Sequence, residues 1–142
     1  MILVDTTVLS YAVGAEHPLR EPCRRLFLAH ADGRIEATTT IEVIQEFTHV
    51  RARRRSRPDA VTLARHYMAA LSLLVTRAED LDLALTLFER QAALGAFDSM
   101  LAAVALNQRL EALVSADRAF GEVPDLRWVD PATATLDQLI ER

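Results

Sequence analysis

Lysine is absent from this sequence, and cysteine and glycine are scarce. All 16 basic residues are arginine, and the 142 residues include one cysteine and four glycines. Without lysine, the chain has neither a lysine nucleophile nor the lysine of a phosphate-binding P-loop. The glycine pattern of that loop is also missing, as is the G-x-G-x-x-G fingerprint of dinucleotide-binding folds. These absences exclude two common classes of nucleotide-binding site.

The single cysteine, Cys23, limits the metal sites that the chain can build. One cysteine forms no internal disulfide and no thiolate metal cluster. The four histidines show no metal-type spacing either (His17, His30, His49 and His66). Carboxylates are therefore the main candidates for metal ligands.

Long apolar runs are also lacking, although 51% of the residues are hydrophobic and 25% are charged. No run approaches the roughly 20 residues of a membrane-spanning helix. The opening apolar run, Met1–Val4, is too short for a secretory signal. We therefore expect a cytoplasmic protein without membrane segments, and a single domain over residues 1–142.

The first ten residues, MILVDTTVLS, combine a strand signal with a carboxylate. Met1–Val4 is apolar without alternation, as in a parallel strand covered on both faces. Asp5 then stands at the carboxyl end of this strand, where open α/β sheets place their ligand crevice. Thr6 and Thr7 are candidate N-caps for a helix over Val8–Val13. Considered alone, Asp5 fits a cap or turn equally well.

The segment from Gly95 to Gly121 repeats this arrangement. Asp98 opens an alanine-rich helix, and the predicted strand Ala112–Ala116 ends on Asp117. Two such strands side by side would bring Asp5 and Asp117 together. A helix N-terminus also stabilises the negative charge of an aspartate. Separately, Asp98 fits a helix cap and Asp117 a turn.

A helix predicted over Ile41–Arg54, capped by Thr40, contributes another carboxylate. At about 100° per residue, Glu46 lies on the border of the apolar face, about 40° from Val50. Glu42 lies farther round, on the wetter side. Glu46 is therefore the better candidate to point toward the sheet edge, although either glutamate also fits a solvated helix charge.

A dense arginine cluster ends this helix, and we expect Pro58 to terminate it. The cluster comprises Arg51, Arg53, Arg54, Arg55 and Arg57. Its structural interpretation is a solvated helix end that complements the helix dipole. Its functional interpretation is contact with a phosphate backbone, which suits the guanidinium fork. The chain as a whole is acidic, with a net charge of −4, and this cluster is its one strongly basic stretch.

Other helices are predicted without evident chemistry. They cover Pro18–Ala31, Pro58–Leu71 and Glu79–Gln91. In the last of these helices, we expect the apolar residues to face inward (Leu81, Ala84, Leu85 and Phe88).

Four phrases, VDTTVLS, VIQEF, FDSMLAAVAL and LVSADRAF, together resemble the PIN-domain family, and most closely its VapC-type toxins. They carry the four acids in the family's order: Asp5, Glu46, Asp98 and Asp117. The resemblance covers nearly the whole chain. It implies an α/β fold, a three-layer PIN-like domain with a central, mostly parallel sheet flanked by helices.

The sequence departs from the family pattern at two hydroxyl positions. Thr7 stands where many members have Asn or Ser, and Ser115 stands where Thr is common. Both exchanges conserve hydrogen-bonding capacity. All four acidic positions match, which is typical of an active member.

The resemblance implies a metal-dependent endoribonuclease, the toxin of a VapBC-type pair. By resemblance, Asp5 and Asp98 are direct metal ligands, Asp117 is a further ligand, direct or through water, and Glu46 orients water. Carboxylate oxygens without cysteine suit Mg²⁺ or Mn²⁺. Such an ion can lower the pKa of a water molecule and stabilise the charge that develops on a phosphodiester.

The implied partners are RNA, a second copy of the chain in a homodimer, and a cognate antitoxin whose arginine or lysine could pair with the acids. Thr6 and Ser115 could hold a water molecule at the metal. The arginines of residues 51–57 could attract the RNA backbone. The apolar helices between Pro18 and Leu71 are candidate surfaces for the dimer or the antitoxin.

Two alternatives remain open. A haloacid-dehalogenase-type phosphatase also begins with an aspartate after its first strand, but it needs a second aspartate where this chain has Thr7, and a lysine. The other alternative is a PIN module without catalytic activity that acts as an RNA-binding or protein-interaction partner. Metal affinity together with RNA cleavage separates this alternative from the enzyme.

Overall fold

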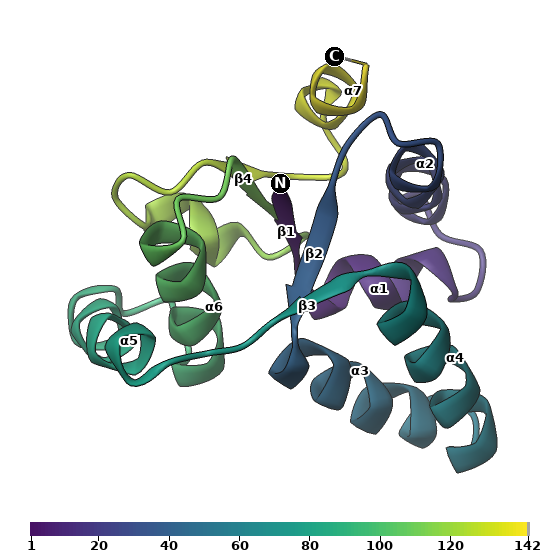
Figure 1. Cartoon of the computed structure of the whole chain (residues 1–142), viewed down its shortest axis with the longest axis horizontal. Coiled ribbons are helices and arrows are strands. Elements are labelled where there is room, and N and C mark those ends of the chain that lie inside the picture. Colours follow the sequence, from purple (N-terminus) through teal and green to yellow (C-terminus); the bar gives the residue numbers. More distant parts are fainter. Residues whose placement is uncertain (142) are drawn as a thin grey trace.

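A five-stranded parallel sheet forms the centre of the computed structural model, which describes residues 1–141 (Figure 1). The strands are β1 (Ile2–Val4), β2 (Ala37–Thr40), β3 (Ser72–Leu74), β4 (Ala112–Val114) and β5 (Trp128–Val129). Their order is β3-β2-β1-β4-β5, and every neighbouring pair is parallel. The predicted mostly parallel sheet is thus confirmed.

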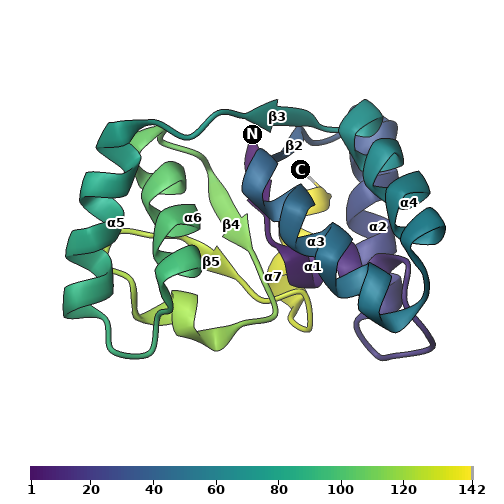
Figure 2. The same ribbon diagram turned by 90° about the horizontal axis from the view of Figure 1, so that it is seen from below.

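Helices cover both faces of this sheet, so the α/β layering is also confirmed. They are α1 (Thr6–Ala12), α2 (Arg20–Ala31), α3 (Ile41–Arg54), α4 (Arg57–Ala70), α5 (Ala78–Arg90), α6 (Ala96–Asn107) and α7 (Ala134–Ile140), with a short 3₁₀ helix, η1 (Arg118–Glu122). Figures 1 and 2 show α1 to α4 on one side of the sheet and α5 and α6 on the other. No helix within residues 1–141 has the length and apolar character needed to cross a lipid bilayer.

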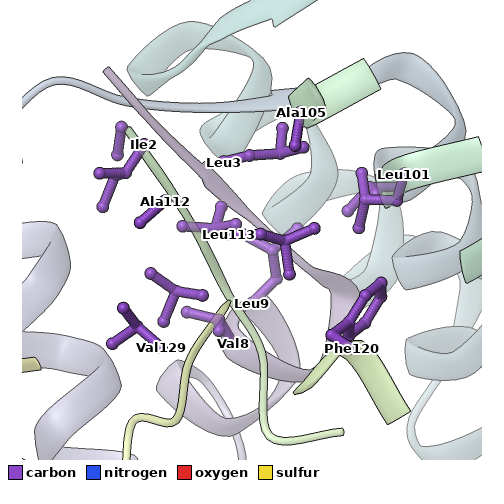
Figure 3. Close-up of a cluster of buried hydrophobic side chains, with 14 of the residues drawn as sticks. Ile2, Leu3, Val8, Leu9, Leu101, Ala105, Ala112, Leu113, Phe120 and Val129 are labelled. Atoms are coloured by element: carbon purple, nitrogen blue, oxygen red, sulfur yellow. The ribbon is translucent and has the colours of Figure 1, made fainter. Parts of the chain in front are cut away.

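The core lies on both faces of β1, the middle strand. Ile2, Leu3 and Val4 are at most 1% exposed. Figure 3 shows side chains of α1 and α6 gathered around this strand and β4. On α6, Ala102 and Ala103 are fully buried, because their small side chains let the helix approach the sheet closely. The apolar run at the start of the chain, predicted as a strand covered on both faces, therefore forms such a strand.

The first helix begins earlier than predicted. Asp5 is its N-cap, and the backbone N–H of Thr6 donates to the Asp5 carboxylate. The prediction that Thr6 or Thr7 caps this helix is therefore wrong: both lie inside it. The cap predicted at Thr40 is confirmed, since its hydroxyl accepts from the N–H of Val43 at 3.2 Å.

The predicted role of Pro58 is also wrong. Helix α3 ends at Arg54, and Pro58 lies in the first turn of α4, whose N-cap Ser56 accepts from the N–H of Asp59. A proline is well tolerated there because the first-turn N–H groups have no partner within the helix. The proline begins the next helix and does not end the previous one.

Helix α5 is rotated relative to the prediction. Three of the four residues expected to face inward are half exposed: Leu81 (48%), Leu85 (58%) and Phe88 (50%). The buried face instead contains Asp80, Ala84 and Leu87. Asp80 explains the rotation, because its carboxylate accepts from the N–H of Arg77 at 2.9 Å and from Asn107 Nδ2 at 2.8 Å. The first of these hydrogen bonds caps α5 itself, and the bond from Asn107, the last residue of α6, holds the Asp80 face against α6.

Candidate active site

The candidate site lies where the strand order changes direction. From β1, the chain builds the sheet outward through β2 and β3, and then returns to place β4 on the other side of β1. In such a sheet the crevice outside the carboxyl ends of the two diverging strands is the usual ligand site. Asp5 follows β1 directly, and its N–H donates to the carbonyl of Val114, the last residue of β4.

A cavity of about 280 Å³ opens at this point. It is lined by Asp5, Thr6, Thr7, Ser10, Tyr11, Glu46, Val50, Arg54, Asp98 and Asp117. The four acids singled out from the sequence therefore share one cavity, although they come from four separate elements. Asp5 follows β1, Glu46 lies on α3, Asp98 lies in the first turn of α6, and Asp117 follows β4 as the cap of η1.

Asp5 is the most buried of these acids, with 5% of its surface exposed. One carboxylate oxygen accepts from the N–H of Thr6 at 2.7 Å, and the other accepts from the hydroxyls of Ser115 at 2.7 Å and Thr7 at 3.2 Å. Burial raises the pKa of Asp5, and these hydrogen bonds act in the opposite direction. Three donors thus fix the orientation of the carboxylate.

The hydroxyls around Asp5 also tie α1 to the end of β4. Ser115 Oγ accepts from the N–H of Asp117 at 3.0 Å, and Thr7 Oγ1 accepts from the N–H of Ala116 at 3.1 Å. The indole N–H of Trp128 donates to the Ser115 carbonyl at 2.9 Å. In this structure the Ser115 hydroxyl therefore serves Asp5 and the backbone of Asp117.

Thr6 differs from the other two hydroxyls. It is 6% exposed, and its Oγ1 has no hydrogen-bond partner within the described part of the chain. A buried hydroxyl without a partner costs free energy, so such groups usually serve a ligand or a water molecule. Thr6 also lines the acidic cavity, but its Oγ1 is itself buried, so the side chain has to turn before the hydroxyl reaches a group bound there.

Asp98 has the most perturbed acidity of the four. Its pKa is raised to about 7, most of all by partial burial, and further by the negative charges of Asp5, Asp117 and Glu46 and by a hydrogen bond with Asp117. The raised pKa reflects mutual repulsion between carboxylates in one cavity as well as burial. A cation bound among these carboxylates would relieve that repulsion.

The donor set fits a hard divalent cation. Its members are carboxylate and hydroxyl oxygens, which Mg²⁺ and Mn²⁺ prefer. Over residues 1–141, however, no three histidine, cysteine or acidic side chains are already drawn together as a metal-binding group. Holding an ion therefore requires the carboxylates around the cavity to rotate toward one another.

The five arginines of the basic cluster occupy different environments. Arg54 lines the acidic cavity, and Arg51, Arg54 and Arg55 line a second cavity beside it. Arg53 and Arg57 are exposed and line neither cavity. The cluster is thus divided between the site and the solvent.

Sequence reasoning missed three residues that line the cavity from α1: Thr7, Ser10 and Tyr11. The sequence analysis names Thr7 as a helix cap and, through the family resemblance, as a hydroxyl position, but not as a residue of the cavity. Their spacing in the sequence could have indicated that they lie together. Residues three and four apart share a helix face, and Ser10 and Tyr11 follow Thr7 at those intervals. A helix that starts at Asp5 therefore presents this face to the cavity.

Comparisons with known proteins agree with this geometry. The family model described as "PIN domain" matches residues 2–126. "Ribonuclease VapC7" of Mycobacterium tuberculosis is 53% identical over 142 residues, covering 99% of this chain and 98% of its own. "Ribonuclease VapC23" of the same species is 41% identical over 102 residues, covering 69% of this chain and 78% of its own.

A solved structure shares the fold at low sequence identity. It is VapBC2 from Rickettsia felis bound to a DNA fragment from its promoter; the TM-score is 0.72 at 15% identity, covering 92% of this chain and 98% of that one. The sheet order, the placement of the four acids and the family match agree with one another. The chain belongs to the PIN-domain family and, within it, to the VapC-type proteins.

Proposed function

We propose that this protein is a metal-dependent endoribonuclease and the toxin of a VapBC-type toxin–antitoxin pair. The observation that carries the proposal is the gathering of Asp5, Glu46, Asp98 and Asp117 around one cavity at the switch point of the sheet. The ribonuclease names of relatives up to 53% identical supply the reaction class. An RNA substrate also favours a cytoplasmic location.

Each acid has a proposed role. Asp5, Asp98 and Asp117 hold Mg²⁺ or Mn²⁺, which when bound activates water and stabilises charge on the phosphodiester. Ser115 and Thr7 keep the Asp5 carboxylate oriented toward the cavity. Glu46, which is exposed on α3, accepts a hydrogen bond from the attacking water and orients it. The unpartnered Thr6 hydroxyl provides another water contact once its side chain turns toward the cavity.

The proposal is tested by incubating the purified protein with pooled total RNA in the presence of Mg²⁺, Mn²⁺ or a chelator. We expect discrete fragments with either metal, loss of cleavage with the chelator, and recovery when Mg²⁺ is restored. Sequencing the fragment ends would identify the cut sites. A Glu36→Gln variant is a suitable control and should cleave like the parent, because Glu36 is exposed, precedes β2 and does not line the cavity.

Two outcomes contradict the proposal. Cleavage that persists undiminished in chelator would show that the acids do not work through a metal ion. RNA binding without cleavage under any metal condition would favour the PIN module that only binds.

We further propose that the protein forms a homodimer through the exposed face of α5. Leu81, Leu85 and Phe88 are spaced four and three residues apart, and each is about half exposed. Contiguous apolar surface of this kind is typical of protein interfaces. We expect the double variant Leu85→Asp, Phe88→Asp to run as a monomer in size-exclusion chromatography with light scattering.

The matched control for the dimer is Val75→Asp, because Val75 is 65% exposed but lies outside α5. It should leave the oligomeric state of the parent unchanged. A double variant that still runs as a dimer would place the interface elsewhere, and a monomeric parent would contradict the homodimer.

For the antitoxin, we propose the apolar cavity between α2 and α4. It has a volume of about 490 Å³ and is lined mainly by apolar and aromatic side chains, including Phe27, Leu63 and Tyr67. All of its lining residues except Val13 lie within the predicted Pro18–Leu71 region. A basic side chain of the antitoxin could in addition pair with the carboxylates of the active site.

A further inference from the structure

A second cavity adjoins the acidic one and has a different character. Its volume is about 240 Å³, and it is lined by Ser10, Gly14, Ala15, Phe47, Val50, Arg51, Arg54 and Arg55. Ser10, Val50 and Arg54 also line the acidic cavity, so the two share a wall. We infer that this arginine cavity binds the phosphodiester group next to the one that is cut, an inference that rests on the proposed ribonuclease function.

The three arginines of this cavity are not equivalent. Arg51 is engaged within the protein: its Nε donates to Asp59 Oδ2 at 2.5 Å, and its Nη1 donates to the Val13 carbonyl at 3.1 Å. The same ion pair holds the pKa of the Asp59 carboxyl below its usual value. Arg51 therefore forms a fixed wall of the cavity, with its charge already matched by a carboxylate.

The guanidinium groups of Arg54 and Arg55 are available to bind an anion. Both are exposed, and neither forms a direct ion pair with a carboxylate within residues 1–141. The charge of Arg55 contributes to lowering the pKa of Asp59, but from a distance. Their guanidinium groups are thus available to an external anion, and arginine is suited to phosphate by its bidentate donors.

Charge distribution explains why such a subsite is needed. The acidic cavity gathers four carboxylates, and Arg54 is the one basic residue in its lining. A strand of RNA brings a negative charge with each nucleotide, so the acidic cavity alone repels the phosphates on either side of the cut. Because the two cavities share Arg54, a strand seated at the acids reaches the arginines with its neighbouring phosphate.

The other lining residues of the arginine cavity support the same inference. Gly14 and Ala15 are small, and the partly exposed Val50 lines both cavities. Small and apolar groups beside free guanidinium groups suit a sugar with its attached phosphate better than a free inorganic ion. The arginine cavity therefore matches one nucleotide unit of an RNA chain.

The test compares two double variants with the same charge change. Arg54→Ala, Arg55→Ala removes the free arginines of the cavity, and Arg53→Ala, Arg57→Ala removes two exposed arginines of the same segment that line neither cavity. Binding of a fluorescein-labelled single-stranded RNA is measured by anisotropy in chelator over a range of salt concentrations, so that cleavage does not interfere. KM and kcat are then measured with Mg²⁺.

The cavity variant should weaken RNA binding about tenfold or more. It should also reduce the slope of log K against log salt by about 0.7, the value for one phosphate of a single strand that is no longer neutralised. Its KM should rise more than its kcat falls. The control pair should change the affinity less than about twofold. Thermal unfolding checks that both variants fold.

Equal losses in the two double variants would show attraction by general charge and overturn the inference, as would no loss in either. Failure of the proposed function is recognised separately, by a parent protein that cleaves no RNA with metal. In that case a loss of RNA binding confined to the cavity variant would support phosphate binding at the arginine cavity, while its position next to a cut would be overturned.

Discussion

Asp98→Asn should nearly abolish RNA cleavage and yet stabilise the metal-free protein. The substitution removes a proposed metal ligand, and losing several kcal/mol of transition-state stabilisation lowers kcat/KM by about 1,000-fold. At the same time it removes a carboxylate whose pKa is raised to about 7 by burial and by the neighbouring acids. One substitution thus separates the functional contribution of this side chain from its cost to folding.

The direction of the stability effect follows from proton binding. The pKa of Asp98 is about 7 in the folded protein, against an ordinary value of 3.8. Between these values the folded state binds more protons than the unfolded state, so the free energy of unfolding falls as the pH rises through this window. Above about pH 7 the full penalty is present, and asparagine removes it.

In chelator at pH 8, we therefore expect Asp98→Asn to be more stable than the parent by about 1–3 kcal/mol, since one pKa unit corresponds to about 1.4 kcal/mol. The difference should shrink toward pH 4 and also when Mg²⁺ is added to the parent. Urea unfolding at pH 5 and pH 8 measures it. A variant less stable than the parent at pH 8, or a difference independent of pH, would contradict the repulsion argument. Glu36→Gln again serves as the control.

The sheet could be predicted because its signals are local. Met1–Val4 is apolar throughout, which indicates a strand covered on both faces, and β1 is such a strand. The strands before Asp5 and Asp117 would bring these two residues together if they lay side by side, and the pairing of β1 with β4 meets this condition. Parallel neighbours end at the same edge, so two aspartates after two such strands share that edge.

The orientation of α5 could not be predicted because a tertiary hydrogen bond decides it. Apolar periodicity favours Leu81, Leu85 and Phe88 as the buried face. Asp80 is buried instead, since its carboxylate accepts from Asn107 on α6, 27 residues away in the chain. A buried carboxylate with partners is invisible to a pattern that counts only hydrophobic residues.

The arginine cluster shows a similar limit. Nothing local distinguishes Arg51 from Arg54, since both are arginines of one helix end. Arg51 is engaged because α4 brings Asp59 to it, and this depends on the turn at Ser56 between the two helices. Only the folded arrangement separates a structural arginine from one free to bind a ligand.

Asp5 should behave differently from Asp98 because it is both a site residue and a helix cap. Asp5→Asn and Asp5→Ala should each lower kcat/KM by about 1,000-fold, since both remove the buried carboxylate that Ser115 and Thr7 hold in place. They should differ in stability. Asparagine keeps an oxygen that can accept from the N–H of Thr6, whereas alanine leaves this cap unmade.

The alanine variant should therefore be less stable than the asparagine variant by about 1–2 kcal/mol, the usual effect of losing an N-cap. Urea unfolding of both variants in chelator measures the difference, and RNA cleavage with Mg²⁺ measures the activity. An Asp5→Asn variant that cleaves like the parent would refute the role of Asp5 in the site. Equal stability of the two variants would refute its role as a cap. Asp98→Asn should stabilise the fold, whereas Asp5→Ala should destabilise it. If both variants lose cleavage, the loss is not a consequence of unfolding. It arises at the cavity that both side chains line.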